Sequence, residues 1–306
     1  MLERALQFVP DVEGEAPVAR WIELHDSTSS SSDYLVCASP ISGSDKLRHL
    51  LWNRASGVIL MSATLTSCGA FDLFLQQSGL SVYAAVQFLR GESPFDYRSN
   101  ARLVIPAMRT DPGDARRHKD EVVERMPGLV QTLGTLVLFA SGKQMREVYA
   151  LLPEDLRRCT LMQGTMPKME MLSRHRAAID SGERSVLFGL QSVSEGVDLP
   201  REYCTHVVCA KLPFSVPDSP LEEARREWIE SQGRSPFIDI TVPETAVRLK
   251  QQLGRLIRTD EDHGTATILD LRLVSRRWGR LLMRGLPDFE LVVEPARGCA
   301  ASGSRG

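Results

Sequence analysis

The stretch Ser185-Val186-Leu187-Phe188-Gly189 is short and almost entirely apolar, and a polar loop that runs to Pro200 follows it. A strand that is apolar on both faces is typical of a parallel sheet covered by helices on both sides. The same pattern predicts further strands over residues 57–61, 102–106, 135–140, 159–162, 205–210 and 265–271. In a sheet of this kind, ligands bind at the loops beyond the carboxyl ends of the strands.

Helical periodicity fills the intervals between these strands. Apolar residues recur at helical spacing over residues 45–54, 114–133, 143–152, 168–180, 220–231, 244–258 and 275–284. This alternation predicts a doubly wound α/β domain over residues 98–295. Residues 1–40 show little periodicity and include a polar Ser/Thr tract at 27–32, while residues 296–306 are rich in Gly, Ser and Arg and are expected to be disordered.

The composition is that of an ordinary globular protein. Of the 306 residues, 42% are hydrophobic and 25% are charged, and the formal net charge is -2. This balance shows no basic excess, although a neutral total can hide a basic groove. We find no apolar run long enough for a membrane helix and no signal peptide, so we expect no membrane partner and a cytoplasmic location. The six cysteines are scattered without a C-x-x-C pair, which predicts no metal site.

The loop from Gly189 to Pro200 carries an unusual density of special residues. Gly189 lets a ligand approach the backbone closely, and Ser192 and Ser194 offer hydroxyl groups after the strand. Gly196 suits a helix stop in the left-handed conformation. Asp198 could brace an arginine or hold water at a nucleotide site. Because a purely connecting loop needs few such residues, the pattern favours a functional loop.

A second polar group lies in the segment from Gln251 to Arg258. If this segment is helical, Gln251, Arg255 and Arg258 project from one face, with Gly254 between them. Two guanidinium groups and an amide on one face suit a polyphosphate, because arginine binds phosphate oxygens bidentately. The alternative is a solvated basic helix end that complements the helix dipole.

Polar residues also follow three other predicted strands. Ser141 precedes a predicted helix, where it suits either an anion site or an ordinary N-cap. Gln163 could reach a nucleic acid backbone or base, or could be an exposed turn residue. Ser62 and Thr64 are small hydroxyl residues at a strand end, where a turn or a cap is the simpler interpretation.

The Gly142-Lys143 pair does not belong to a Walker A loop. Val137 stands where the first glycine of that motif would be, and Gln144 stands where Ser or Thr would be. A Walker B acid is also absent, because Asp270 is not followed by Glu. The chain therefore lacks the phosphate cradle of a complete P-loop ATPase.

Taken together, residues 55–294 resemble the second motor domain of superfamily 2 DNA helicases of the XPD/DinG family, most closely its DinG-like members. The resemblance rests on four segments in the family's order: Ser62 to Leu65 (motif III), Leu138 to Ser141 (motif IV), Gly189 to Leu199 (motif V) and Gln251 to Arg258 (motif VI). It implies a RecA-like parallel sheet with flanking helices, preceded by a partial segment of another domain.

The resemblance implies an ATP site shared between two motor domains. Arg255 and Arg258 would be the catalytic arginine fingers that face the γ-phosphate. Gln251, Gly254, Gly196 and Asp198 would form the rest of this chain's ATP-binding group. ATP and Mg²⁺ would be shared with a first motor domain, and the family's iron–sulfur cluster would need cysteines that this sequence lacks.

The resemblance also implies contacts with DNA and with the first motor domain. Ser141, Gln163 and Ser192 would contact phosphates of single-stranded DNA, with little dependence on base sequence. Ser62 and Thr64 would lie at the junction with the first motor domain. Residues 1–70 would be the remnant of an arch-like insertion plus the last strand of that domain, 71–295 the C-terminal RecA-like domain, and 296–306 a disordered tail.

The expected function is that of the C-terminal motor domain of an ATP-dependent DNA helicase in repair or replication. We expect the chain alone to be inactive, because the Walker A and B residues would lie on the other domain. The alternative is a non-catalytic nucleic-acid-binding or regulatory module with a RecA-like fold. A third idea, an α/β transferase, ranks behind both because no G-x-G-x-x-G follows a first strand.

Overall fold

The computed structural model describes residues 3–4, 17–25, 33–194, 198–215 and 217–295. The chain divides into two compact units. The smaller unit contains residues 1–90 and 215–244, and the larger contains residues 91–214 and 245–306. The residues expected to form one C-terminal domain, 71–295, are thus distributed over both units.

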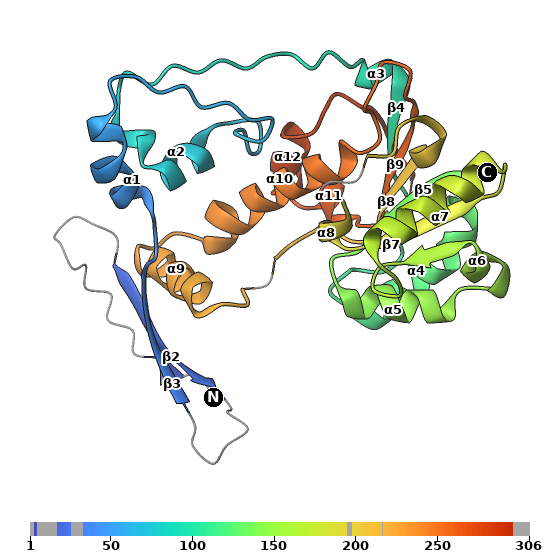
Figure 1. Ribbon diagram of the computed structural model, residues 1–306, viewed down its shortest axis with the longest axis horizontal. Helices are drawn as coiled ribbons and strands as arrows, with labels where there is room; N and C mark the ends of the chain where they lie inside the picture. Colours follow the sequence, from blue (N-terminus) through green and yellow to red (C-terminus); the bar gives the residue numbers. More distant parts are fainter. Residues whose placement is uncertain (1–2, 5–16, 26–32, 195–197, 216, 296–306) are drawn as a thin grey trace, which may run out of the picture. The chain divides into compact units, whose positions relative to one another are not determined.

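The described part of the larger unit is built on a seven-stranded parallel sheet (Figure 1). The strand order is β10-β4-β9-β8-β5-β7-β6. The strands are β4 (Ala101–Ile105), β5 (Gly134–Leu138), β6 (Thr160–Met162), β7 (Ser185–Gly189), β8 (His206–Cys209), β9 (Gly264–Ile268) and β10 (Glu290–Val293). The expected parallel α/β sheet is confirmed.

Helices precede the first strand of this sheet and connect the later ones. They are α3 (Tyr97–Asn100), α4 (Ala115–Leu129), α5 (Gly142–Leu151), α6 (Glu154–Arg158), α7 (Lys168–Asp180), α8 (Gln191–Ser194), the 3-10 helix η3 (Arg201–Cys204), α11 (Arg272–Ser275) and α12 (Gly279–Arg284). Among the described residues, no helix is both long and apolar enough to cross a bilayer.

The core of the larger unit lies between the sheet and its helices. All five residues of β7 are buried, because neighbouring elements cover both of its faces. Val186 and Phe188 pack in one cluster with Val122 and Met126 of α4 and Met145 of α5. The strand β7 therefore has the two-sided burial that its apolar sequence predicts.

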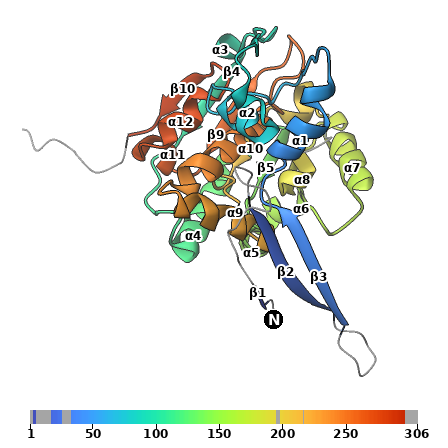
Figure 2. The same cartoon turned by 90° about the vertical axis from the view of Figure 1, so that its left-hand side faces the viewer.

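The smaller unit contains an antiparallel sheet and several short helices. Its strands are β1 (Glu3–Arg4), β2 (Val18–His25) and β3 (Asp33–Pro40), and β2 and β3 form a long ribbon (Figure 2). Its helices are α1 (Ser44–Leu50), η1 (Trp52–Arg54), α2 (Asp72–Ser78), η2 (Leu80–Val82) and α9 (Pro220–Ser231), followed by the π-helical turn η4 (Phe237–Thr241). The division at residue 244 falls within α10 (Val242–Leu253).

One expected strand is absent, and one expected helix is shorter than predicted. Residues 57–61 form no strand; they are exposed coil, with Ile59 86% and Met61 87% exposed. The helix expected over 244–258 ends at Leu253. In addition, the ribbon of β2 and β3 forms where little periodicity is visible in the sequence. The polar tract at 27–32 lies outside the described residues.

Candidate functional site

Three of the predicted site residues follow neighbouring strands at the carboxyl edge of the parallel sheet. Gln163 follows β6, Ser192 lies in α8 after β7, and Ser141 follows β5. The strands β5, β7 and β6 are adjacent in the sheet. Beyond the strand ends, Gln163 N–H donates to Phe188 O at 2.8 Å, which extends the ladder towards the site.

The side chain of Gln163 joins two of the strand-end loops. Its Nε2 donates to Ser192 Oγ at 3.0 Å, and its Oε1 accepts from Leu190 N–H at 2.8 Å. The neutral side-chain amide of Gln163 is thereby held between the Ser192 hydroxyl group and the backbone N–H of Leu190. The two predicted residues Gln163 and Ser192 are in direct contact, although they lie far apart in the sequence.

Ser141 stands at the start of α5 but does not cap it with its side chain. The hydroxyl group makes no capping hydrogen bond, while Ser141 O accepts from Met145 N–H at 3.0 Å as the helix begins. Ser141 is exposed. Its hydroxyl group is therefore not used for the N-cap role that the sequence allowed.

The second group of predicted residues surrounds the end of α10. Because the helix ends at Leu253, Gln251, Arg255 and Arg258 do not share one helical face, which corrects the expected geometry. Arg255 lies in the turn after the helix and is half-buried. Arg258 Nε lies 3.8 Å from Asp198 Oδ1, so this arginine faces the acid of the 189–200 loop.

Gly254 lies in the turn that ends α10. Its N–H donates to Lys250 O at 2.9 Å, and a Cβ built at this position would lie 3.0 Å from the same oxygen. The close approach favours glycine at the helix end. Gly196 lies outside the described residues. Gln251 is half-buried, whereas its neighbour Gln252 is buried and accepts from Cys209 Sγ at 3.5 Å.

Asp262 is a site residue that the sequence reasoning missed. Its carboxylate is 2% exposed and accepts from the N–H groups of Arg258 at 2.6 Å, Thr259 at 2.7 Å and Arg201 at 2.7 Å. Burial alone would raise the pKa of Asp262, but these backbone hydrogen bonds outweigh it and lower the pKa. Asp262 thereby ties the segment of Arg258 to the β7–β8 connection.

The β7–β8 connection is held by further contacts around Asp198. Arg176 of α7 donates to Asp198 O at 2.8 Å and lies 5.9 Å from the centroid of the Tyr203 ring. Arg201 adopts a positive φ of 56°, a strained conformation for a residue with a side chain. Strain of this kind persists only where the surroundings hold it, here through the bond to Asp262.

The site offers cations for phosphate oxygens. Among the residues that the structure describes, no group of three His, Cys, Asp or Glu side chains could hold a metal ion. The thiols of Cys204 and Cys209 are buried, and burial raises the pKa of each to about 12, so neither is a ready thiolate.

Ser62 and Thr64 belong to the smaller unit, where they form a local hydroxyl turn. Their hydroxyl oxygens lie 3.1 Å apart, and Thr64 N–H donates to Ser62 Oγ at 3.2 Å. Nearby, Ser67 Oγ donates to Pro243 O at 2.6 Å. The turn is thus well defined although residues 57–61 before it form no strand.

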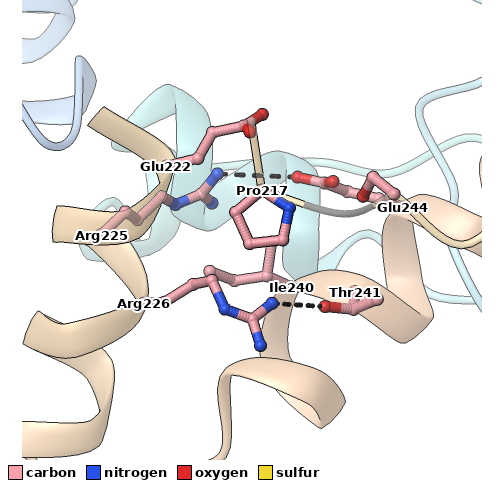
Figure 3. A pocket seen from close by; sticks show the side chains of 8 residues that line it. Pro217, Glu222, Arg225, Arg226, Ile240, Thr241 and Glu244 are labelled. Carbon is pink, nitrogen blue, oxygen red and sulfur yellow. Dashed lines mark hydrogen bonds and ion pairs between the residues drawn. The ribbon is translucent and has the colours of Figure 1, made fainter. Parts of the chain in front are cut away.

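The smaller unit also contains a pocket beside α9 and η4 (Figure 3). Arg225 and Glu244 form an ion pair of 3.6 Å across it, and Arg226 Nη1 donates to Thr241 Oγ1 at 3.2 Å. The charges on its walls are of both signs. These contacts brace α9 against the start of α10.

Comparison with known proteins identifies the family. A family model described as the helicase C-terminal domain matches residues 129–289. The chain belongs to this family. The match covers the carboxyl-edge site of β5, β6 and β7 and the whole segment from Gln251 to Asp262.

Curated relatives agree with this assignment. The chain is 40% identical over 298 residues to the ATP-dependent DNA helicase DinG of Photobacterium profundum, covering 95% of this chain and 42% of that protein. It is 36% identical over 281 residues to the ATP-dependent DNA helicase DinG of Escherichia coli K12, covering 90% of this chain and 39% of that protein. The chain thus spans about two fifths of the length of these relatives.

A solved structure of XPD in its apo form shares the fold. It matches with a TM-score of 0.58 at 18% identity, covering 90% of this chain and 54% of that chain. The resemblance to the XPD/DinG family that the motifs indicated is confirmed, as is the RecA-like fold class.

Proposed function

We propose that this chain acts as the C-terminal motor domain of an ATP-dependent DNA helicase, in unwinding linked to DNA repair or replication. The observation that carries the proposal is the placement of Arg258, whose backbone N–H is held by Asp262 and whose guanidinium faces Asp198. Similarity to DinG helicases supports the same role.

In the proposed mechanism, Arg258 and Arg255 bind the terminal phosphates of ATP. A guanidinium stays charged and can stabilise the negative charge that develops on phosphate oxygens as the γ-phosphoryl group leaves. Asp198 orients the guanidinium group of Arg258 before ATP binds. Gln251, Gly254 and Gly196 complete this chain's part of the ATP site. Mg²⁺ would be bound with ATP and shared with a first motor domain.

The carboxyl edge of β5, β7 and β6 is proposed to bind single-stranded DNA. Ser141, Gln163 and Ser192 present hydroxyl and amide groups that suit phosphate oxygens. The contact between Gln163 and Ser192 supports a single continuous surface. Because such groups read the backbone, binding is expected to depend little on base sequence.

The partner is proposed to be a first motor domain with the Walker A and B residues. In this account Ser62 and Thr64 contact that domain, and residues 1–70 belong to it and to an arch-like insertion. Residues 71–295 would form the C-terminal RecA-like domain, and the tail expected over 296–306 lies outside the described residues.

The proposal is tested with the purified 306-residue chain. We expect it to bind single-stranded DNA but to show no ATP hydrolysis and no unwinding, with or without DNA, because the chain lacks a phosphate cradle. ATP hydrolysis by the chain alone that Arg258→Ala abolishes would contradict the proposed division of labour. Absence of any DNA binding would favour a regulatory module instead.

A further inference from the structure

The proposed DNA-binding residues carry no charge, although binding to a strand of phosphates is mainly electrostatic. Ser141, Gln163 and Ser192 are neutral. Two cationic side chains, Arg146 of α5 and Lys168 of α7, lie beside them and have no role in the function proposed above. Lys168 contacts Ser192, and Arg146 lies beside Gly142, the residue that follows Ser141.

Lys168 is held against Ser192. Its Nζ donates to Ser192 O at 3.3 Å, and Ser192 Oγ accepts from Gln163 Nε2 at 3.0 Å. Lys168 is the first residue of α7, so its backbone lies at the positive end of a 13-residue helix. The ammonium group therefore contacts Ser192 directly and is linked through Ser192 to Gln163.

Arg146 belongs to α5, and its side chain lies beside Gly142 at the start of this helix. A Cβ built on Gly142 would be 3.4 Å from Arg146 Nη1 and 3.7 Å from Leu190 Cδ1. Leu190 is the residue whose N–H donates to Gln163. Arg146 is exposed, and within the described part of the chain no carboxylate forms an ion pair with it.

We propose that Arg146 and Lys168 are the phosphate-binding cations of a track for single-stranded nucleic acid across the carboxyl ends of β5, β7 and β6. The inference rests on the DNA-binding role proposed above and names the groups that give it affinity. Ser141, Gln163 and Ser192 lie at the same strand ends and would donate hydrogen bonds to phosphate oxygens of the same strand. None of the five side chains is aromatic, so these five groups would contact phosphates and would not stack on bases.

The test is the salt dependence of binding to a fluorescent oligo(dT) strand. Each phosphate neutralised on a single strand contributes about 0.7 to the slope of log K against log salt concentration. We expect Arg146→Gln and Lys168→Gln each to lower the slope by about 0.7, and the double variant by about 1.4. Arg158→Gln is the matched control. Arg158 is an exposed arginine just before the amino end of β6, whereas the proposed track lies at the carboxyl ends of the strands.

The outcomes separate this inference from the function on which it rests. A folded double variant that keeps the wild-type slope overturns the role of Arg146 and Lys168 and leaves the DNA-binding proposal standing. Absence of salt-sensitive binding by the wild-type chain overturns both. A second probe, an abasic strand of equal length, is expected to bind within about twofold of oligo(dT); a loss of tenfold or more indicates base stacking and contradicts a phosphate-reading track.

Discussion

Asp262 holds the backbone around Arg258 in a conformation that is not helical. A continued α-helix would direct the Arg258 N–H to the carbonyl of Gly254. Asp262 instead accepts this N–H and that of Thr259 with one carboxylate oxygen. An acidic side chain that binds nearby backbone amides competes with helical hydrogen bonds. Apolar periodicity does not reveal this competition. The helix expected over 244–258 is therefore longer than the observed α10, which ends at Leu253.

Replacement of Asp262 should destabilise the folded chain. Asp262→Ala removes the acceptor of three backbone N–H groups, and we expect a loss of about 2 kcal/mol in the free energy of unfolding. Urea denaturation measures this loss. Asp260→Ala, at an exposed neighbouring position, should change the free energy by less than about 0.5 kcal/mol. Equal effects of the two substitutions would show that the carboxylate does not hold the loop.

At the scale of elements, buried histidines join helices to the sheet. His175 of α7 faces Tyr203 O with Nε2 and Ser185 Oγ with Nδ1, both at 2.8 Å. A carbonyl oxygen only accepts, so Nε2 carries the hydrogen and Nδ1 accepts from the hydroxyl group. The same neutral arrangement holds for His118 and His206, which face Leu269 O and Leu129 O. Burial lowers the pKa of all three rings.

These histidines predict a loss of stability in mild acid. A ring whose pKa is lower in the folded state binds its proton more readily when unfolded. Its contribution is complete above the unfolded pKa of about 6.5 and is lost as the pH falls towards the folded pKa. We therefore expect the free energy of unfolding to decrease between about pH 7 and pH 5, above the range in which most carboxylates titrate.

Urea denaturation over this pH range measures the effect. His175→Gln should reduce the pH dependence by removing one of the buried rings. His263→Gln is the control, because His263 is exposed and its replacement disturbs no buried hydrogen bond. A free energy of unfolding that stays constant or rises as the pH falls would show that the buried rings are not neutral in the folded chain.

The elements differ in how far their sequence reveals them. The apolar stretch of β7 and the periodicity of α7 and α9 predict these elements with the observed bounds, since each buries its apolar residues within one unit. Residues 57–61 are as apolar as β7 but have no neighbouring strand in the described structure. An apolar stretch indicates only that a segment is suited to a sheet. It does not indicate whether a partner strand is available.

The ribbon of β2 and β3 shows the opposite case. Ala19 and Trp21 lie on one face of β2, while the equally apolar Ile22 and Leu24 lie on the other and are exposed. Because apolar residues stand on both faces, no alternation is visible in the sequence. Likewise, Asp262, Arg146 and Lys168 carry no motif, and only the folded chain brings them to the predicted site residues.

As a whole molecule, this chain is proposed to supply one half of an ATP site. The chain is similar to about two fifths of DinG from Photobacterium profundum. A chimera of that helicase, with its matching region replaced by this chain, would supply the other half. Within it, Arg258 should stabilise charge on the transferred phosphoryl group, as an arginine finger does.

The most direct measurement is the turnover rate of ATP by this chimera at saturating ATP and single-stranded DNA. We expect DNA-stimulated hydrolysis that Arg258→Ala reduces by about a thousandfold. Arg117→Ala, at an exposed arginine near the start of α4, should leave the rate unchanged. An active chimera whose rate is the same with Arg258 and with alanine would contradict the claim.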